Sequence, residues 1–376
     1  MHLISKNSRI TVVIVCAIWC VILTVIFDRY AYQIDAFDAR IRLALTAGST
    51  DIRNFDTNGL PISYSASTGR KFISPFYVVH YGLMYSNNLV KRSERVGPEW
   101  FEDKSVAYWN LPPKVYKQNY FKNCADWVVS HISKSYGQAH LIYDFDWRYR
   151  NYPNGGLKAP WWSGLTDGYA IILLLRAHDV YGDARYLQAA SELYSSVLTP
   201  IAEGGSLNQF HGHPWIEEYV DPNANPADMS FVLNGMIYAT YGVEVYEKYT
   251  SVREPQSAKL YQSIDDNLQS YDRGYWSEYD AIGNATNIKY QRVHVALLER
   301  ISEITGDERI KRIRNRWEFG VENAGFFWIL NSHWGYSQWQ FILEYLLLIL
   351  LPLFLAFLLC CRKVKKVVLL EGRKEA

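Results

Sequence analysis

The chain has 376 residues, of which 49% are hydrophobic, and its formal net charge is +1. The near-neutral charge excludes the strongly basic class of nucleic-acid-binding proteins, so no nucleic-acid partner is expected. The length and apolar content are sufficient for one large core, or for a core with a small satellite.

Each end of the chain carries an apolar run. Residues 10–27 contain no charged side chain and are just long enough to span a bilayer, and residues 342–361 form a Leu-rich run. Because basic residues flank the outer end of both runs, the sequence predicts two transmembrane helices, with residues 1–9 and 362–376 in the cytoplasm. The predicted protein thus contacts the lipid bilayer, and its central domain is extracytoplasmic, at a cell surface or, in a eukaryote, in the Golgi lumen. A cleaved signal peptide is the alternative for the first run, and a buried core helix for the second.

Residues 28–119 form a region of different character. Between Ser49 and Phe76, an Asn-Gly pair, a Thr-Gly pair and serine clusters separate short alternating segments. Such punctuation is typical of a β-hairpin. We therefore expect a small β-hairpin region ahead of the main domain, folded over its mouth.

Residues 120–335 repeat a unit of helix, tight turn and helix. Residues 170–181 are apolar on nearly every side, Gly182–Asp183 turns the chain, and residues 184–198 are amphipathic. The same turn recurs at Gly306–Asp307. One such pair cannot bury its inner helix alone, so several pairs predict a mostly α domain built as a curved array or toroid. The other predicted pairs are residues 232–249 with 258–271 and residues 294–305 with 308–319.

The segment from Trp215 to Gly242, WIEEYVDPNANPADMSFVLNGMIYATYG, places two acids and a tyrosine ahead of an apolar helix. Residues 221–228 are rich in Pro, Asn and Asp, which favour turns. Ser230 is expected to cap the helix that follows. The EEY sequence at 217–219 is therefore expected at the mouth of the helical domain, as a candidate catalytic loop.

The EEY sequence is followed by SFVLNG at 230–235. Three other segments carry motifs of the same kind, namely SPFYVVHYGLMYSNN at 74–88, LKAPWWSGLTDGYAIILLLRA at 157–177 and SYDRGYWSEYDAIGNATNIKYQRVH at 270–294. Together they resemble, in the same order over most of residues 60–318, the C-terminal domain of the D-glucuronyl C5-epimerases, which invert uronic acid residues in heparan-type polymers. The resemblance implies an α/α-barrel domain over residues 120–335.

The chain departs from this family in several places. Val220 stands where the family has a proline. Only residues 89–120 occupy the place of a large β-rich domain that supplies polymer-binding surface in the animal enzymes. A heparan-type substrate is therefore not carried over to this chain.

Inversion at C5 requires that a proton alpha to a carboxylate be removed and that one be returned from the opposite face. The resemblance implies that Glu218 is the catalytic acid and that Tyr219, Tyr279 and Tyr290 are the catalytic tyrosines. The family arginine that follows the second tyrosine has no match, because Ile282 stands there. Neutralisation of the substrate carboxylate is therefore expected from Arg273, Arg292 or His294.

Other residues are candidates for sugar contacts. Trp161 and Trp162 are adjacent at a helix entrance, so one of them is expected to face the cleft and stack on a pyranose ring. Each assignment has a structural alternative, because the chain holds 29 tyrosines and loop acids are common. The predicted substrate-binding set is Tyr77, Trp161, Trp162, Trp215, Asn234, Arg273, Arg292 and His294.

No metal or organic cofactor is predicted. His211, His213 and Glu217 have a spacing that resembles a metal-ligand set, but they lie in a loop and lack the helical HExxH context. Only Cys124 of the five cysteines lies outside the two apolar runs, which gives neither a disulfide framework nor a thiolate cluster between them. The chain also lacks a glycine loop that would cradle a phosphate.

The sequence therefore predicts a membrane-anchored uronyl C5-epimerase that converts D-glucuronate to L-iduronate, or a related uronate pair, in a glycan. Its expected partner is a uronic-acid-containing polysaccharide or glycan, with a homodimer as an option. A polysaccharide lyase or a glycosidase is the first alternative, although the acid pair is adjacent in sequence and poorly placed to straddle a bond. A non-catalytic glycan-binding protein is the second.

Overall fold

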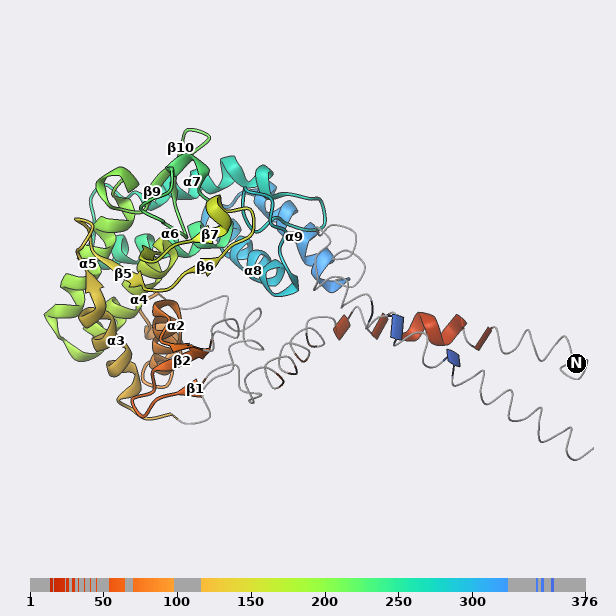
Figure 1. Ribbon diagram of the computed structural model, residues 1–376, viewed down its shortest axis with the longest axis horizontal. Coiled ribbons are helices and arrows are strands. Elements are labelled where there is room, and N and C mark those ends of the chain that lie inside the picture. The colour runs from red at the N-terminus through yellow and green to blue at the C-terminus, as the bar shows by residue number, and fades with distance from the viewer. Residues whose placement is uncertain are drawn as a thin grey trace, which may run out of the picture.

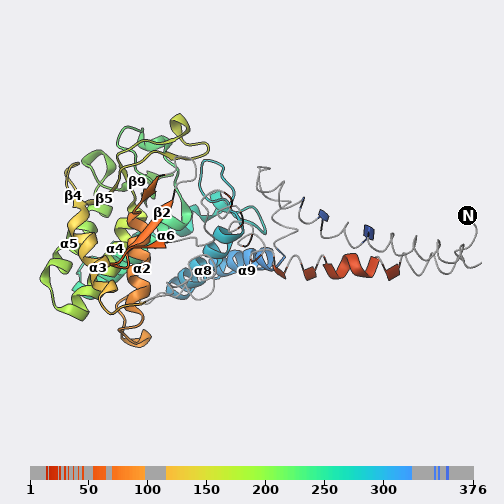
Figure 2. The same cartoon turned by 60° about the horizontal axis from the view of Figure 1, so that its bottom comes forward.

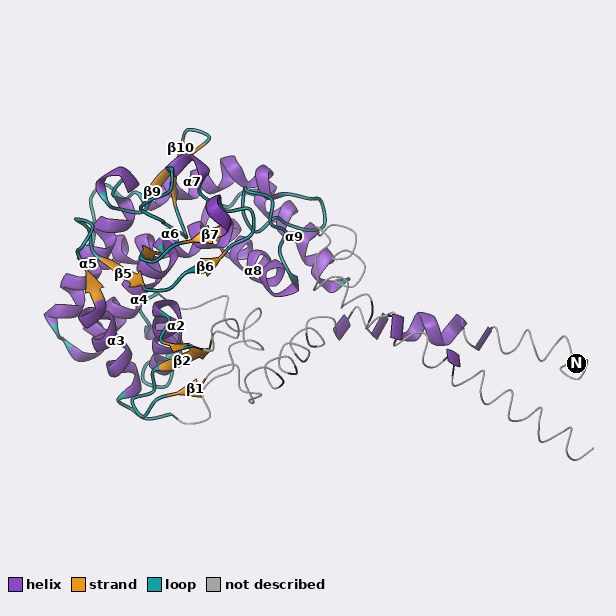
Figure 3. Cartoon of the chain, viewed as in Figure 1, coloured by secondary structure: helices purple, strands orange, loops and turns teal. Residues whose placement is uncertain are grey.

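The computed structural model describes residues 54–64, 70–97 and 116–323, together with parts of 14–45 and of 343–354. Helices dominate the described residues, and the strands are short (Figure 3). The helices are α2 (Pro75–Ser86), α3 (Tyr120–His131), α4 (Gly164–Tyr181), α5 (Ala184–Leu198), α6 (Leu233–Thr250), α7 (Ser257–Asn267), α8 (Ile288–Thr305) and α9 (Glu308–Glu322). The strands are β1 (Asn54–Phe55), β2 (Pro61–Tyr64), β3 (Lys71–Phe72), β4 (Ile132–Ser133), β5 (His140–Tyr143), β6 (Trp147–Arg148), β7 (Gly156–Leu157), β8 (Trp161–Trp162), β9 (Leu207–Phe210) and β10 (His213–Ile216).

Consecutive helices pack as pairs, α2 with α3, α4 with α5, α6 with α7 and α8 with α9 (Figure 1). The first members of the pairs form an inner row, in which α4 contacts α2 and α6, and α6 contacts α8. The second view shows α8 and α9 together at one end of this arc (Figure 2). The paired, mostly helical architecture agrees with the prediction from the repeated turns.

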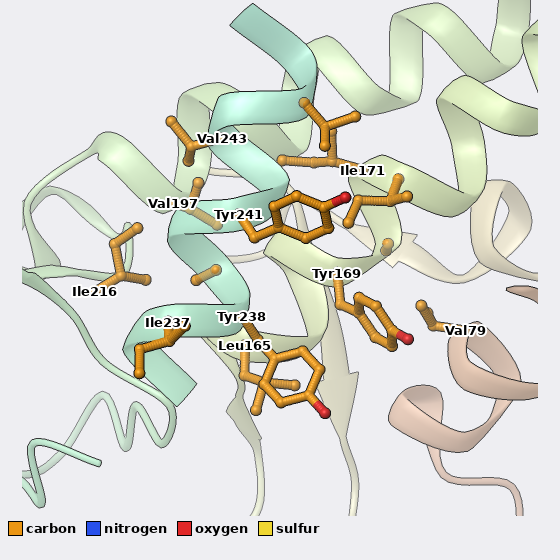
Figure 4. Close-up of a cluster of buried hydrophobic side chains, with 14 of the residues drawn as sticks. Val79, Leu165, Tyr169, Ile171, Val197, Ile216, Ile237, Tyr238, Tyr241 and Val243 are labelled. Atoms are coloured by element: carbon orange, nitrogen blue, oxygen red, sulfur yellow. The ribbon is translucent and has the colours of Figure 1, made fainter. Parts of the chain in front are cut away.

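The core lies between α4 and α6. Every side chain of α4 from Gly164 to Ala177 is buried, whereas α5 buries one face only. Side chains of α4 and α6 interleave with Val79 of α2 and Val197 of α5 (Figure 4). A helix that is apolar on all sides must be surrounded by other elements, and this burial explains the inner row.

The same type of turn joins the two helices of a pair in two of the pairs. Gly182 and Gly306 end α4 and α8 in the left-handed conformation, at φ +66° and +68°. Asp183 and Asp307 follow them and cap the next helices, since each carboxylate accepts a hydrogen bond from a backbone N–H of the first turn. The Gly-Asp pair thus ends one helix and begins the next.

The small sheets lie around the helices. Strands β1, β2 and β3 form an antiparallel sheet in which Asn54 pairs with Ile62 and Ser63 pairs with Phe72, so the expected hairpin gains a third strand. Strands β4, β5 and β8 form a second sheet, and β9 pairs with β10 and β6 with β7 as two-stranded ribbons.

The predicted pair of transmembrane helices, and with it the two-pass membrane localisation, is wrong. Within the part of the chain that the structure describes, no helix has the length and apolarity needed to cross a membrane. Only part of the run at 10–27, and little of the run at 342–361, lies within the described residues. A span requires a continuous apolar helix of about 20 residues, and hydropathy of the sequence alone does not show that helix.

Close packing of α4 against α6 depends on glycine. A Cβ atom at position 242 would lie 1.9 Å from the carbonyl oxygen of Gly168. We expect Gly242→Ala to lower the free energy of unfolding by about 1–3 kcal/mol, because the backbone clash outweighs the better helix propensity of alanine. Thermal unfolding measures this change, and Thr250→Ala at the exposed end of the same helix is the control. An unaltered or raised free energy of unfolding in Gly242→Ala would show that α4 and α6 can move apart without destabilising the fold.

Candidate active site

A cavity of about 270 Å³ opens where the inner helices begin. The first turns of all four inner helices line it, and strands β2 and β3 add Ser63, Tyr64 and Phe72 at its edge. The helical lining comprises Ser74, Phe76, Tyr77 and His80 of the α2 segment, Ser163, Leu165 and Thr166 of the α4 segment, Asn234 and Tyr238 of α6, and Lys289, Tyr290 and Val293 of α8.

Helix N-termini carry partial positive charge and unpaired backbone N–H groups, so their convergence favours an anionic ligand. The α4 terminus is capped by Ser163, whose hydroxyl accepts from the backbone N–H of Thr166. Asn287 caps α8 by accepting from the backbone N–H of Tyr290. These caps fix the helix starts, and with them the side chains that face the cavity.

The carboxyl group of Glu218 lies at the centre of the site. Its Oε1 accepts a hydrogen bond from the Tyr279 hydroxyl at 3.3 Å, and its Oε2 accepts from Asn234 Nδ2 at 3.3 Å. The hydroxyl groups of Tyr279 and Tyr219 are 3.0 Å apart. The Tyr290 ring packs edge-on against that of Tyr279, with 4.9 Å between centroids. The structure therefore brings all four predicted catalytic side chains together.

The loop that carries Glu218 is held by backbone contacts on both sides. Val220 exchanges two backbone hydrogen bonds with Trp162, and the Glu217 amide donates to the Ser206 carbonyl. Gly235 lets the loop approach α6, since a Cβ there would lie 2.4 Å from the Cβ of Glu218. Ser230 does not cap α6 as predicted, because the helix begins after Val232 with no side-chain cap.

Burial controls the proton affinity of these groups. It raises the pKa of Glu218 to about 7, although hydrogen bonds from neighbouring tyrosines oppose the shift. Burial, followed by the nearby Glu218 charge, holds the pKa of both Tyr219 and Tyr279 well above the usual value for phenols. At neutral pH the phenols are therefore proton donors, and Glu218 is the group that changes its charge.

Glu217 points away from the cavity. Its Oε1 accepts from Asn208 Nδ2 at 3.1 Å and its Oε2 from the backbone N–H of Phe231 at 3.1 Å. Phe231 has a positive φ of 50°, and its carbonyl oxygen accepts from the Tyr271 hydroxyl. Burial raises the pKa of Glu217 to about 8. Glu217 thus anchors a strained backbone segment instead of facing a substrate.

The predicted substrate-binding residues divide into two groups. Tyr77, Trp161 and Asn234 line the cavity. Trp161 also stacks on Tyr143 at 4.0 Å. Its neighbour Trp162 points the other way and stacks on His140 at 4.5 Å, because adjacent residues of a strand face opposite sides.

The other predicted substrate-binding residues contact other parts of the protein. Trp215 is buried and stacks on Tyr271 with 5.8 Å between centroids. Arg273 pairs with Glu278 at 2.7 Å, and Arg292 lines a separate cleft. His294 is buried beside Ser277 Oγ at 2.8 Å, and burial lowers its pKa to about 3. None of these side chains lines the cavity that contains Glu218.

The residues with metal-like spacing are also engaged separately. His211 Nδ1 bonds Asn267 Oδ1 at 2.9 Å, and His213 lies 3.2 Å from Asp266. Among the described residues, no three histidine, cysteine or acidic side chains come together in a way that could hold a metal ion.

Sequence reasoning missed several residues in or beside the site, and two of them, Tyr149 and Lys289, contact the predicted tyrosines. Tyr149 packs edge-on against Tyr219 at 5.1 Å, and its hydroxyl donates to Asp280. Lys289 lines the cavity beside Tyr290. The position of Lys289 directly before a predicted catalytic tyrosine was a signal for it, whereas no local signal marks Tyr149.

Comparison with known proteins points to the class of carbohydrate epimerases. Residues 137–319 match the family model described as D-glucuronyl C5-epimerase C-terminus. The D-glucuronyl C5-epimerase of Caenorhabditis elegans is 30% identical over 220 residues, which are 52% of this chain and 34% of that protein. An uncharacterized protein of Methanocaldococcus jannaschii is 29% identical over 180 residues, 46% of this chain and 56% of that one. The chain thus spans about a third and about half of the length of these relatives.

Solved structures that match this chain are more distant. Cellobiose 2-epimerase from Spirochaeta thermophila is 14% identical, with a TM-score of 0.36 over 52% of this chain and 49% of that one. Unsaturated glucuronyl hydrolase from Bacillus sp. GL1 is 15% identical, with a TM-score of 0.36 over 65% of this chain and 62% of that one. Scores this low have no bearing on function.

The raised pKa of Glu217 predicts a pH-dependent stability. Because the folded state holds this proton more tightly than the unfolded chain, the contribution of Glu217 to stability is greatest below its ordinary pKa of 4.5 and declines as pH rises toward about 8. Denaturant unfolding between pH 5 and pH 8 should show a decline that is smaller in Glu217→Gln, by on the order of a few kcal/mol. The exposed Glu254→Gln is the control. Parallel curves for all three proteins would contradict the buried-carboxyl assignment.

Proposed function

We propose that this chain is a uronyl C5-epimerase that converts D-glucuronate to L-iduronate units, or a related uronate pair, in a glycan. The observation that carries the proposal is the hydrogen-bonded chain from Glu218 through Tyr279 to Tyr219, beside a cavity lined by helix N-termini. The match of residues 137–319 to the D-glucuronyl C5-epimerase model supports the same chemistry.

The reaction consists of two proton transfers. In the first, the C5–H bond breaks, the proton passes to a base, and the electron pair moves into the adjacent carboxylate to give an enediolate-like species. In the second, an acid on the opposite face gives a proton to C5, and the electron pair returns to form the new C–H bond. No bond other than C5–H is broken or formed overall, and each turnover leaves the base protonated and the acid deprotonated, so one proton must pass between them before the next turnover.

A relay accounts for the base. Tyr219 lines the cavity, so its oxygen can accept the C5 proton while its own proton passes to Tyr279 and the proton of Tyr279 passes to the ionised carboxylate of Glu218. The pKa of Glu218, about 7, lets this carboxylate be ionised in part at neutral pH and still hold a proton well. The Tyr219 hydroxyl, 3.0 Å from that of Tyr279, begins the relay. Tyr290, from the first turn of α8, is then the second acid/base group.

The alternatives lack support in the cavity. A glycosidase of the usual kind requires two carboxyl groups on either side of the glycosidic bond. Among the described residues that line the cavity, Glu218 is the one carboxylate, since Glu217 points into the protein. A lyase would share the C5 deprotonation and differ in its product, which is unsaturated. A non-catalytic binding role does not account for three tyrosines gathered around a carboxyl of raised pKa.

Replacement of Tyr279 tests the relay. Tyr279→Phe removes the hydroxyl between Glu218 and Tyr219 but keeps the ring, so epimerisation should fall by about two to four orders of magnitude while the fold is retained. Proton NMR of uronans incubated with the protein in deuterated water measures both exchange and inversion at C5. Tyr219→Phe and Tyr290→Phe belong to the same series, and at least one of the three should exchange the C5 proton without net inversion.

The control is Tyr246→Phe, whose ring stacks on Tyr194 away from the cavity. Rates near that of the unaltered protein for all three site variants would refute the tyrosine assignment, and an unsaturated product would indicate a lyase.

The raised pKa of Glu218 predicts the pH profile. The relay requires the ionised carboxylate, so kcat/KM should rise with pH through about 7 as Glu218 loses its proton. Glu218→Gln should be severely impaired across the range. A kcat/KM that falls steadily between pH 6 and pH 8 would show that Glu218 acts in its protonated form.

A further inference from the structure

The substrate carboxylate needs a cationic partner that the sequence did not identify. A charged carboxylate weakly activates the C5 proton, because deprotonation places further negative charge on its oxygens. The three candidates from the sequence lie elsewhere, with Arg273 paired to Glu278, Arg292 in a separate cleft and His294 buried. Among the described residues that line the cavity, Lys289 contributes the one lysine or arginine side chain.

The fold holds Lys289 beside the tyrosines. It is the second residue of α8, and the cap from Asn287 to the backbone of Tyr290 fixes the turn that carries it. Its Nζ lies 5.3 Å from the centroid of the Tyr290 ring, and that ring packs against Tyr279 at 4.9 Å. The ammonium group therefore shares the cavity with Tyr219 and Tyr290.

We propose that Lys289 binds the carboxylate of the uronate in the cavity and thereby makes the site specific for acidic over neutral sugars. The proposal deepens the function proposed above and rests on it for the reaction. Charge on an ammonium stabilises the enediolate-like species more than the ground state, because the negative charge on the carboxylate oxygens grows as the C5 proton leaves. The α8 N-terminus adds partial positive charge in the same direction.

The nearest competing role is support of Tyr290. A cation close to a phenol favours the phenolate, so Lys289 could serve proton transfer without touching the substrate carboxylate. The two roles differ in one observable. A carboxylate-binding lysine discriminates a uronate from the matching neutral sugar, whereas a lysine that acts on Tyr290 affects turnover and leaves that discrimination unchanged.

The experiment therefore measures binding and exchange separately. Binding of methyl β-D-glucuronide and of neutral methyl β-D-glucoside is titrated by NMR on the full chain, the Lys289→Met and Lys289→Arg variants, and Lys311→Met as control. Lys311 is an exposed lysine of α9 whose partner is Glu308. Exchange of the C5 proton on a uronan in deuterated water is measured on the same four proteins.

The unaltered protein should prefer the glucuronide by about tenfold or more, and Lys289→Met should lose that preference. C5 exchange in Lys289→Met should fall by on the order of a hundredfold or more. Lys289→Arg should keep part of the preference, because it keeps the charge in a different shape. Lys311→Met should match the unaltered protein in both measurements.

Two results would overturn the proposal. The first is equal binding of the two glycosides by the unaltered protein, including no binding of either. The second is an undiminished preference in Lys289→Met, which would assign Lys289 to Tyr290 or to the fold. A preference that depends on Lys289 without any C5 exchange would leave the carboxylate site standing and refute the epimerase reaction instead.

Discussion

The site depends on the burial of two adjacent carboxyl groups, Glu217 and Glu218, near the start of α6. Removing a carboxylate from water is unfavourable unless hydrogen-bond donors meet it. Asn208 and the Phe231 amide meet Glu217, while Asn234 and Tyr279 meet Glu218. The donors only partly offset the burial, and both carboxyls keep a raised pKa. The same burial that holds the loop in place therefore gives Glu218 a proton affinity suited to acid/base chemistry near neutral pH.

The order of the helices decides where that chemistry takes place. Each outer helix returns the chain to the end where the preceding inner helix began, so the inner helices α2, α4, α6 and α8 all present their first turns to one cavity. The Gly-Asp turn makes this return short in two of the pairs. Partial positive charge from aligned helix starts then accumulates around a single point. A scaffold of this kind suits an acidic substrate before any side chain is considered.

The sequence predicted the local parts of this arrangement better than the tertiary ones. Periodicity and the repeated turns located the helix pairs, and the family resemblance located Glu218 and the tyrosines that surround it. It also placed one of two adjacent tryptophans in the cleft, and Trp161 lines the cavity. The sequence could not show which basic side chain faces the cavity, because tertiary packing decides where Arg273, Arg292 and Lys289 point. Hydropathy likewise identified apolar runs at both ends, but a membrane span also requires a long helix, and the described residues contain none of sufficient length and apolarity.

The exchange of a family arginine for Ile282 fits the packing of its loop. Ile282 packs against the aromatic cluster that includes Tyr149, and its backbone N–H donates to Asp280. Asp280 also accepts from Tyr149 and Asn284, so the loop after Tyr279 is fixed by an apolar contact and a hydrogen-bonded acid. A cation at position 282 would disturb that cluster. A lysine at the start of α8 supplies positive charge from a helix that is already capped and packed, which leaves the loop free to position Tyr279 alone.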